Sequence, residues 1–76
     1  MLEELKQIIY EYVDDKGIAI DENTVLIADL GLSSLDLVDM ACTAEDRFNI
    51  QIPDRVIRDF RTVGDVIAYI EKQKNA

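Results

Sequence analysis

Apolar residues recur at spacings of three and four in three separate stretches of this chain, and this period constrains the fold more than any other feature. Such spacing predicts amphipathic helices that each bury one side. The stretches span residues 2–15, 34–48 and 62–73. A chain of 76 residues has room for one modest core, so these helices must pack against one another. We expect an all-α fold, a small four-helix bundle, in a single domain over residues 1–76.

The first helix is followed by a long segment, residues 17–32, whose apolar residues lack a helical period. Asp14, Asp15 and Gly17 mark the end of the helix before it. A loop of this length in so small a domain must be held in place by burying its own side chains. A strand over residues 25–27 would have no obvious pairing partner. The expected anchors are Ile18, Ile20, Val25, Leu26, Ile27 and Leu30.

The remaining helix boundaries follow from local signals. Asn49 ends the helix over 34–48, and Pro53 suits the first position of a short third helix over residues 53–59. Thr62 and Asp65 have the spacing of a capping box that starts the last helix. The expected bundle therefore has three main helices and one short third helix, with the long loop after the first.

Acidic residues outnumber basic ones by sixteen to eight, giving a net charge of −8. This balance argues against nucleic acid as a partner, because phosphate contacts need clustered lysine and arginine. It favours partners with basic surfaces and fast, salt-sensitive encounters. Residues 55–61 are the exception, with three arginines and one aspartate.

The single cysteine, Cys42, cannot form an internal disulfide, which suits a reducing compartment. The N-terminal residues carry acids where a signal peptide would carry bases. No apolar run approaches membrane-spanning length. We therefore expect a cytoplasmic protein without membrane insertion.

The helix over residues 34–48 has apolar residues on two sides. At 100° per residue, one sector gathers the core stripe of Leu37, Met40, Ala41, Ala44 and Phe48. The opposite side carries Leu35, Val38 and Cys42, with Asp36, Asp39, Glu45 and Asp46 around them. Exposed apolar groups rimmed by charge commonly form docking sites. This side therefore predicts a docking face for a partner with an apolar patch flanked by lysine or arginine.

Two serines stand at the start of this helix. Ser33 and Asp36 have the spacing of a capping box, so Ser33 accepts from a backbone N–H. Ser34 then falls in the first turn, where its side chain stays free in solvent. Spacing alone does not separate a capping role from a chemical role for either serine.

Residues 29–36, DLGLSSLD, resemble the signature of the acyl carrier protein family. In that family a serine followed by leucine and an acid opens the second helix, behind a Leu-Gly pair. Residues 45–48 (EDRF), 52–54 (IPD) and 62–65 (TVGD) are similar to the family's later helix boundaries. The resemblance covers nearly the whole chain, in order and without large gaps.

The resemblance implies a carrier, not an enzyme. Ser34 matches the serine to which a separate phosphopantetheinyl transferase attaches phosphopantetheine from coenzyme A. The arm then carries an acyl group as a thioester, for fatty acid biosynthesis or a related pathway such as polyketide or specialised lipid synthesis. The family also implies a monomer that meets acyl-loading and acyl-processing enzymes. In agreement, the sequence contains no histidine, metal-ligand cluster or phosphate loop.

The resemblance also assigns roles to other residues. The acids Asp36, Asp39, Glu45 and Asp46 match positions where carriers contact basic patches on their enzymes, and Leu35, Val38 and Cys42 match the apolar part of that contact. The candidates for lining an inter-helix space that shelters an acyl chain are Met40, Ala44, Ile52, Ile57, Phe60 and Ile67, each of which also reads as plain core.

Two departures from the family pattern stand out. Ser33 replaces an aspartate that many members have before the modified serine, which keeps Ser33 as an alternative attachment site. Arg55, Arg58 and Arg61 form a basic segment where carriers of general fatty acid synthesis are acidic or neutral. These arginines either pair internally with nearby aspartates, Asp54 or Asp59, or mark a carrier for a dedicated pathway.

Three other functions share features with an acyl carrier or are suggested by the size and acidity of the chain. A peptidyl or aminoacyl carrier would share the fold and the serine. A helical interaction module without a prosthetic group would share the acidity. A calcium-binding module would need alternating acidic loop positions, a central glycine and a closing glutamate, and neither acidic loop has that spacing.

Overall fold

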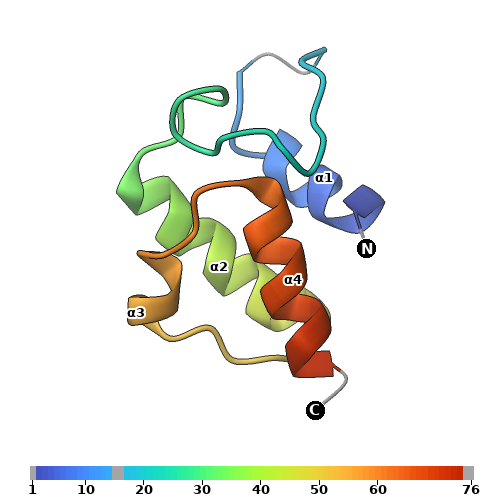
Figure 1. Ribbon diagram of the computed structural model, residues 1–76, viewed down its shortest axis with the longest axis vertical. Helices are drawn as coiled ribbons and strands as arrows, with labels where there is room; N and C mark the ends of the chain where they lie inside the picture. Colours follow the sequence, from blue (N-terminus) through green and yellow to red (C-terminus); the bar gives the residue numbers. More distant parts are fainter. Residues whose placement is uncertain (1, 15–16, 75–76) are drawn as a thin grey trace.

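The computed structural model describes residues 2–14 and 17–74, and within these residues it forms four helices (Figure 1). They are α1 (Leu2–Tyr10), α2 (Ser34–Phe48), α3 (Asp54–Ile57) and α4 (Val63–Lys74). The predicted helical bundle, with a short third helix and a long loop after the first, is confirmed. The predicted range of α2, residues 34–48, agrees with the structure at both ends.

The core lies between α1, α2 and α4 and is built from the inward side of each helix (Figure 1). The predicted stripe of α2 is buried along its whole length, from Leu37 to Phe48. From the other two helices the buried residues are Leu5, Ile8, Ile9, Val63, Val66, Ile67 and Ile70. Each such side chain stabilises the fold by about 1.5–3 kcal/mol relative to exposure, so this one cluster holds the bundle together.

The first helix is shorter than its apolar period predicts. It ends at Tyr10, and the backbone N–H groups of Glu11 and Tyr12 donate to carbonyls three residues back, at 3.1 and 2.9 Å. This is the tighter geometry of a 3₁₀ turn. The Tyr10 hydroxyl donates to the carbonyl of Ile18 at 2.8 Å, so the loop folds back onto the helix end. The predicted range 2–15 is therefore wrong beyond Tyr10, and its last residue lies outside the described part of the chain.

The long loop is anchored as predicted by Ile20, Leu26 and Leu30, which are buried, while Ile27 is 53% exposed. The prediction for Ile27 is wrong because the chain turns directly after the isolated antiparallel bridge between residue 25 and Thr62. The N–H groups of Asp29 and Gly31 donate to the carbonyls four residues back, at 2.9 and 3.0 Å. Leu26 and Leu30, which are four residues apart, share the buried side of this turn, and Ile27 lies on its outer side. The other two predicted anchors, Ile18 and Val25, are half-buried.

The bridge supplies the partner that the sequence did not reveal for this segment. The N–H of Leu26 donates to the carbonyl of Arg61 at 2.9 Å, and the N–H of Val63 donates to the carbonyl of Thr24 at 3.0 Å. The N–H of Gly64 donates to the carbonyl of Glu22 at 2.8 Å. These backbone bonds tie the long loop to the start of α4.

The capping box predicted for α4 is confirmed. The Asp65 carboxylate accepts the N–H groups of Thr62 and Arg61, both at 3.1 Å, and the Thr62 hydroxyl accepts the N–H of Asp65 at 3.2 Å. The backbone bonds from Thr62 and Arg61 favour the ionised carboxylate and lower the pKa of Asp65 below its ordinary value of 3.8.

The third helix is shorter than the predicted range 53–59. Pro53 has extended backbone angles, φ −64° and ψ 152°, so it stands before the helix as its N-cap and not at its first helical position. After Ile57 the chain continues in three-residue turns, with the N–H of Asp59 bonded to the carbonyl of Val56 at 3.0 Å. In Figure 1 α3 lies beneath the N-terminal half of α2, and the two helices are in contact. Asp54 and Ile57 of this short helix line the same groove as Ser34.

Among residues 2–14 and 17–74, no helix is both long and apolar enough to cross a membrane. The same residues contain no group of three or more side chains placed to hold a metal ion.

Candidate functional site

The start of α2 is fixed by a reciprocal pair of hydrogen bonds. The Ser33 hydroxyl accepts the N–H of Asp36 at 3.2 Å, and the Asp36 carboxylate accepts the N–H of Ser33 at 3.0 Å. Ser33 has the extended backbone of an N-cap, with φ −90° and ψ 170°. The predicted capping box is therefore confirmed, and the hydroxyl of Ser33 has a structural partner.

Ser34 is the first residue of α2, and its side chain is exposed. The first turn of a helix has free backbone N–H groups and the positive end of the helix dipole, which together favour a phosphate. The capping pair beside it leaves the Ser34 hydroxyl outside the local hydrogen-bond network. Ser34 therefore combines an accessible primary hydroxyl with an environment suited to a phosphodiester.

A surface groove of about 430 Å³ runs beside Ser34. This volume lies within the range typical of small-molecule sites. The groove joins the start of α2 to the long loop and to the α3 region. Its walls are formed by Ile27, Ser34, Leu37, Val38, Asp54, Ile57, Arg58 and Phe60.

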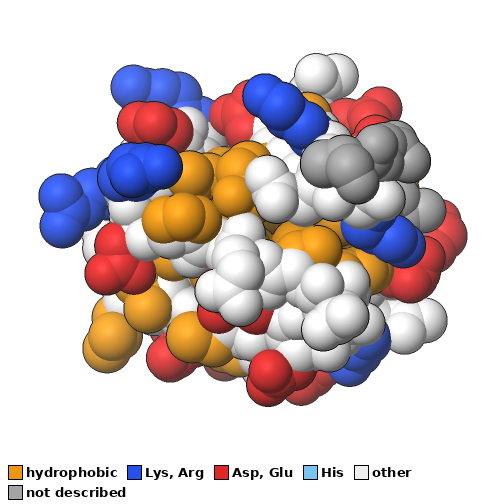
Figure 2. All heavy atoms as spheres, turned by 90° about the horizontal axis from the view of Figure 1, so that it is seen from below, with side chains coloured by type: hydrophobic (Ala, Val, Ile, Leu, Met, Phe, Trp, Pro, Cys, Tyr) orange, Lys and Arg blue, Asp and Glu red, His pale blue; other side chains and the backbone are white. Residues whose placement is uncertain are grey.

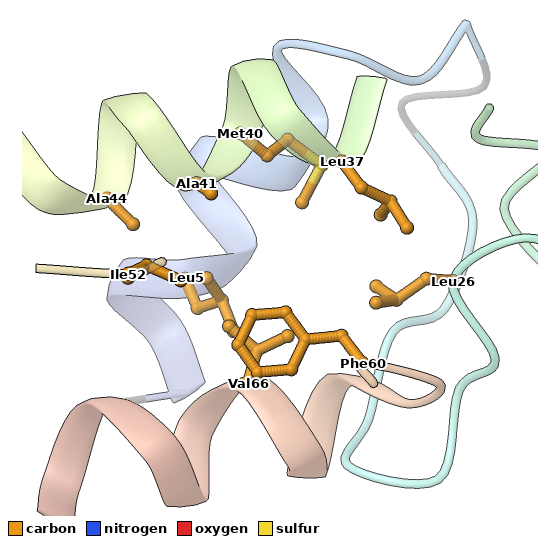
Figure 3. Close-up of a pocket in the computed structure, with 9 residues that line it drawn as sticks. All are labelled: Leu5, Leu26, Leu37, Met40, Ala41, Ala44, Ile52, Phe60 and Val66. Atoms are coloured by element: carbon orange, nitrogen blue, oxygen red, sulfur yellow. The ribbon is translucent and has the colours of Figure 1, made fainter. Parts of the chain in front are cut away.

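A second space lies inside the bundle and is far smaller, about 20 Å³ (Figure 3). This is roughly the room that one water molecule needs. The side chains that point into it come from three helices and three loops: Leu5, Leu26, Leu37, Met40, Ala41, Ala44, Ile52, Phe60 and Val66. Leu37 and Phe60 line both spaces, so the inner space adjoins the surface groove at these two side chains.

The six candidates for lining an acyl space are distributed over these two spaces. Met40, Ala44, Ile52 and Phe60 line the interior cavity. Ile57 lies in the wall of the groove, and Ile67 is buried without lining either space. The sequence did not single out Leu5, Leu26, Leu37, Ala41 and Val66 for this role. No periodicity could have done so, because the cavity is shared by elements that only folding brings together.

The outward side of α2 carries the residues expected to dock partners. Leu35 is 70% exposed and Val38 is 37% exposed, and Cys42 is also exposed. Asp39 and Asp46 are exposed around them. Ile27 joins Val38 in the groove wall, so the apolar surface beside Ser34 is wider than α2 alone provides.

The other two predicted docking acids have structural partners as well. Asp36 belongs to the capping box. Glu45 accepts the N–H of Ile52 through one carboxylate oxygen at 2.7 Å, which holds the segment between α2 and α3 against the end of α2. The carboxylates of Asp36 and Glu45 therefore stabilise the fold through these hydrogen bonds.

A small helical bundle that presents a free serine hydroxyl at a helix start, beside a groove and an acidic helix face, belongs to the class of phosphopantetheine-bearing carriers. Residues 3–70 match the family described as "Phosphopantetheine attachment site". Relatives named acyl carrier protein are 35% identical over 97% of both chains in Wolinella succinogenes, and 38% identical over 95% of this chain and 94% of the relative in Chlamydia caviae. The chain belongs to the acyl carrier protein family.

The fold leads to the same family. The crystal structure of an acyl carrier protein from Thermotoga maritima superposes with a TM-score of 0.84 at 27% identity, over 97% of this chain and 86% of that chain. The predicted family and acyl carrier function are thus confirmed. The protein carries acyl groups as thioesters on a covalently attached phosphopantetheine and is a carrier, not an enzyme. Its partners include a phosphopantetheinyl transferase and acyl-processing enzymes.

Proposed function

We propose that Ser34 is the residue that bears the phosphopantetheine arm. The observation that carries this proposal is that the two serine hydroxyls have different surroundings. The Ser33 hydroxyl accepts the Asp36 N–H, whereas the exposed Ser34 side chain stands beside the groove. A transferase that used Ser33 would have to break the cap of α2, which costs about 1 kcal/mol.

The attachment needs little from this chain beyond the hydroxyl. The oxygen of Ser34 forms a bond to the phosphorus of coenzyme A that bears pantetheine, the pyrophosphate bond breaks, and adenosine bisphosphate leaves. A base of the transferase takes the serine proton, since the chain contains no histidine. The arm supplies a terminal thiol for the thioester. The first turn of α2 stabilises the negative phosphodiester through its free N–H groups and its dipole.

We further propose that the outward side of α2 docks the partner enzymes. Leu35, Val38 and Cys42 would contact an apolar patch, and Asp39 and Asp46 would face lysines or arginines around it. Asp36 and Glu45 would add charge to the same encounter while keeping their structural bonds. The protein would act as one monomeric domain, and the cytoplasmic location expected from its cysteine usage stays a prediction.

The site assignment is tested by locating the modification. The full-length protein is incubated with coenzyme A and a broad-specificity phosphopantetheinyl transferase, digested, and sequenced by fragmentation mass spectrometry. The peptide spanning residues 29–46 should carry one phosphopantetheine on Ser34. Modification on Ser33, or an unmodified protein, would contradict the assignment.

A further inference from the structure

The arginines of the α3 region form no ion pair within the part of the chain that the structure describes, although the Asp65 carboxylate lies close to Arg61 and accepts its backbone N–H at 3.1 Å. The ion pairs among these residues are Lys6 with Glu3 and Arg47 with Glu11, both at 3.9 Å. The sequence left open that Asp54 or Asp59 neutralises the basic segment, and the structure shows no such pair in residues 2–14 and 17–74. All three arginines are exposed. Their side chains are therefore accessible to an anion from outside the protein.

Two of these arginines border the space next to Ser34. Arg58 lines the groove that contains Ser34, and it also lines a second hollow of about 400 Å³. The hollows share Ile27, Arg58 and Phe60, so they lie side by side, and we name the two together the side trough. The second hollow adds Arg61 at the end away from Ser34. Arg55 borders neither hollow.

The surface view shows where basic side chains gather. Seen from below, they lie at the left edge of the molecule, the side on which α3 lies in Figure 1, next to exposed hydrophobic side chains and with acidic side chains between them (Figure 2). An apolar floor with a positive border suits a ligand that has an apolar stem and an anionic end.

Charge also varies along the side trough. Asp54 lies in the wall of the hollow that contains Ser34, whereas the second hollow has Arg61 and no acid among its lining residues. An anion is repelled by Asp54 and attracted by the guanidinium groups of Arg58 and Arg61. The favoured position for a carboxylate is therefore the Arg61 end, and the planar guanidinium matches its two oxygens.

The interior of the bundle offers little competing space in this conformation. Its cavity of about 20 Å³ holds no more than a water-sized group. The side trough is open at the surface without any movement of the core.

We propose that the side trough binds an acyl cargo whose far end carries a carboxylate, with Arg58 and Arg61 as the residues that hold this carboxylate. The inference rests on the proposed function, because it requires the cargo to be attached at Ser34. It assigns this carrier a class of cargo, monothioesters of dicarboxylic acids, and gives the basic segment a role toward the cargo itself.

The experiment compares two cargoes of equal chain length. A broad-specificity transferase loads the full-length protein from glutaryl-coenzyme A or from pentanoyl-coenzyme A, which has a methyl group in place of the distal carboxylate. Intact mass confirms loading. The nitrogen-bound Hε signals of the arginines are then compared by NMR between the two acyl forms and the form that carries the arm alone. Without loading at Ser34, the proposed function fails before the inference is reached.

The proposal predicts that glutaryl loading shifts the signals of Arg58 and Arg61 but not that of Arg55, and that pentanoyl loading leaves all three in place. Glutaryl loading should also shift the backbone amide signals of Val25 and Ile27, which line the trough. The variant Arg58→Gln/Arg61→Gln should lose these glutaryl-specific shifts, and the matched control Arg55→Gln should keep them. Melting temperatures verify that both variants fold.

Three outcomes would overturn the proposal. Full shifts of the arginine Hε signals in the protein that carries the arm without an acyl group would mean that the arginines bind the phosphodiester. Equal shifts with both cargoes would mean that the trough recognises only the apolar stem. Unchanged arginine signals in correctly loaded protein would leave the basic segment to partner enzymes, as a docking element for a dedicated pathway.

Discussion

Ser33 and Asp36 each accept the backbone N–H of the other, at 3.2 and 3.0 Å. This reciprocal pair starts α2 and commits the Ser33 hydroxyl to the backbone. The next residue, Ser34, keeps its hydroxyl exposed at the same helix end. Two adjacent serines of the same chemistry thus have different tasks because one stands before the helix and the other within it.

The contribution of the Ser33 cap should be measurable as a change in the free energy of unfolding. Ser33→Ala removes the acceptor for the Asp36 N–H and should lower the free energy of unfolding by about 1 kcal/mol. Ser33→Asp keeps an acceptor of similar capping strength and should fall close to wild type. Urea denaturation monitored by circular dichroism gives both values. Equal stability of Ser33→Ala and wild type would show that the capping bond contributes nothing.

Docking through α2 predicts a charge effect that depends on position. Asp39→Arg should slow transfer of the arm from coenzyme A by about tenfold at low salt, with a smaller effect at high salt, because exposed charges steer encounters. Asp36→Arg should also slow it but should destabilise the protein as well, since Asp36 caps α2. Glu71→Arg, an exposed acid on α4, is the matched control. A rate loss at Glu71→Arg equal to that at Asp39→Arg would place the docking face elsewhere.

Replacing Gly64 by alanine should destabilise the protein, although alanine has the higher helix propensity. A Cβ at this position would lie 2.9 Å from the carbonyl oxygen of Glu22, which accepts the Gly64 N–H at 2.8 Å. Alanine is favoured over glycine by about 1 kcal/mol in a helix, yet Gly64→Ala should destabilise by about 1–3 kcal/mol through this clash. Ala68→Gly, at an exposed site of the same helix, isolates the propensity term. A stabilised Gly64→Ala would show that the loop moves away without cost.

The Asp65 cap predicts an acid-sensitive stability. Its pKa is lowered in the folded protein by the N–H groups of Thr62 and Arg61, so its contribution is full above the unfolded value of 3.8 and is lost as the pH falls through the folded value. The difference in unfolding free energy between wild type and Asp65→Asn should therefore shrink as the pH falls below 3.8. Chemical denaturation at several pH values measures the difference. A difference that stays constant with pH would contradict the role of the ionised carboxylate.

Local signals explain why the sequence predicted α2 and the start of α4 so closely. Their caps pair residues three apart, Ser33 with Asp36 and Thr62 with Asp65, and these pairs are visible in any reading of the chain. The end of α1 was missed because it depends on where the loop returns, at the Tyr10 contact with Ile18.

Long-range pairing explains what the sequence could not supply about the site. Ile27 is exposed because the chain turns directly after the bridge between Val25 and Thr62, and no local pattern indicates this bridge. The same holds for the groove, where Ser34 and Arg58 share a wall only because α3 folds beneath α2. The serine that we propose for attachment could therefore be named from the sequence, whereas the surface around it had to come from the fold.

The central claim is that Ser34, and not its neighbour, accepts the phosphopantetheine arm. The most direct test is the intact mass of Ser34→Ala and Ser33→Ala after incubation with coenzyme A and a broad-specificity transferase, with helicity checked by circular dichroism. We predict that Ser33→Ala gains the mass of one phosphopantetheine while Ser34→Ala, fully helical, gains none. A Ser34→Ala protein that still gains this mass would contradict the claim.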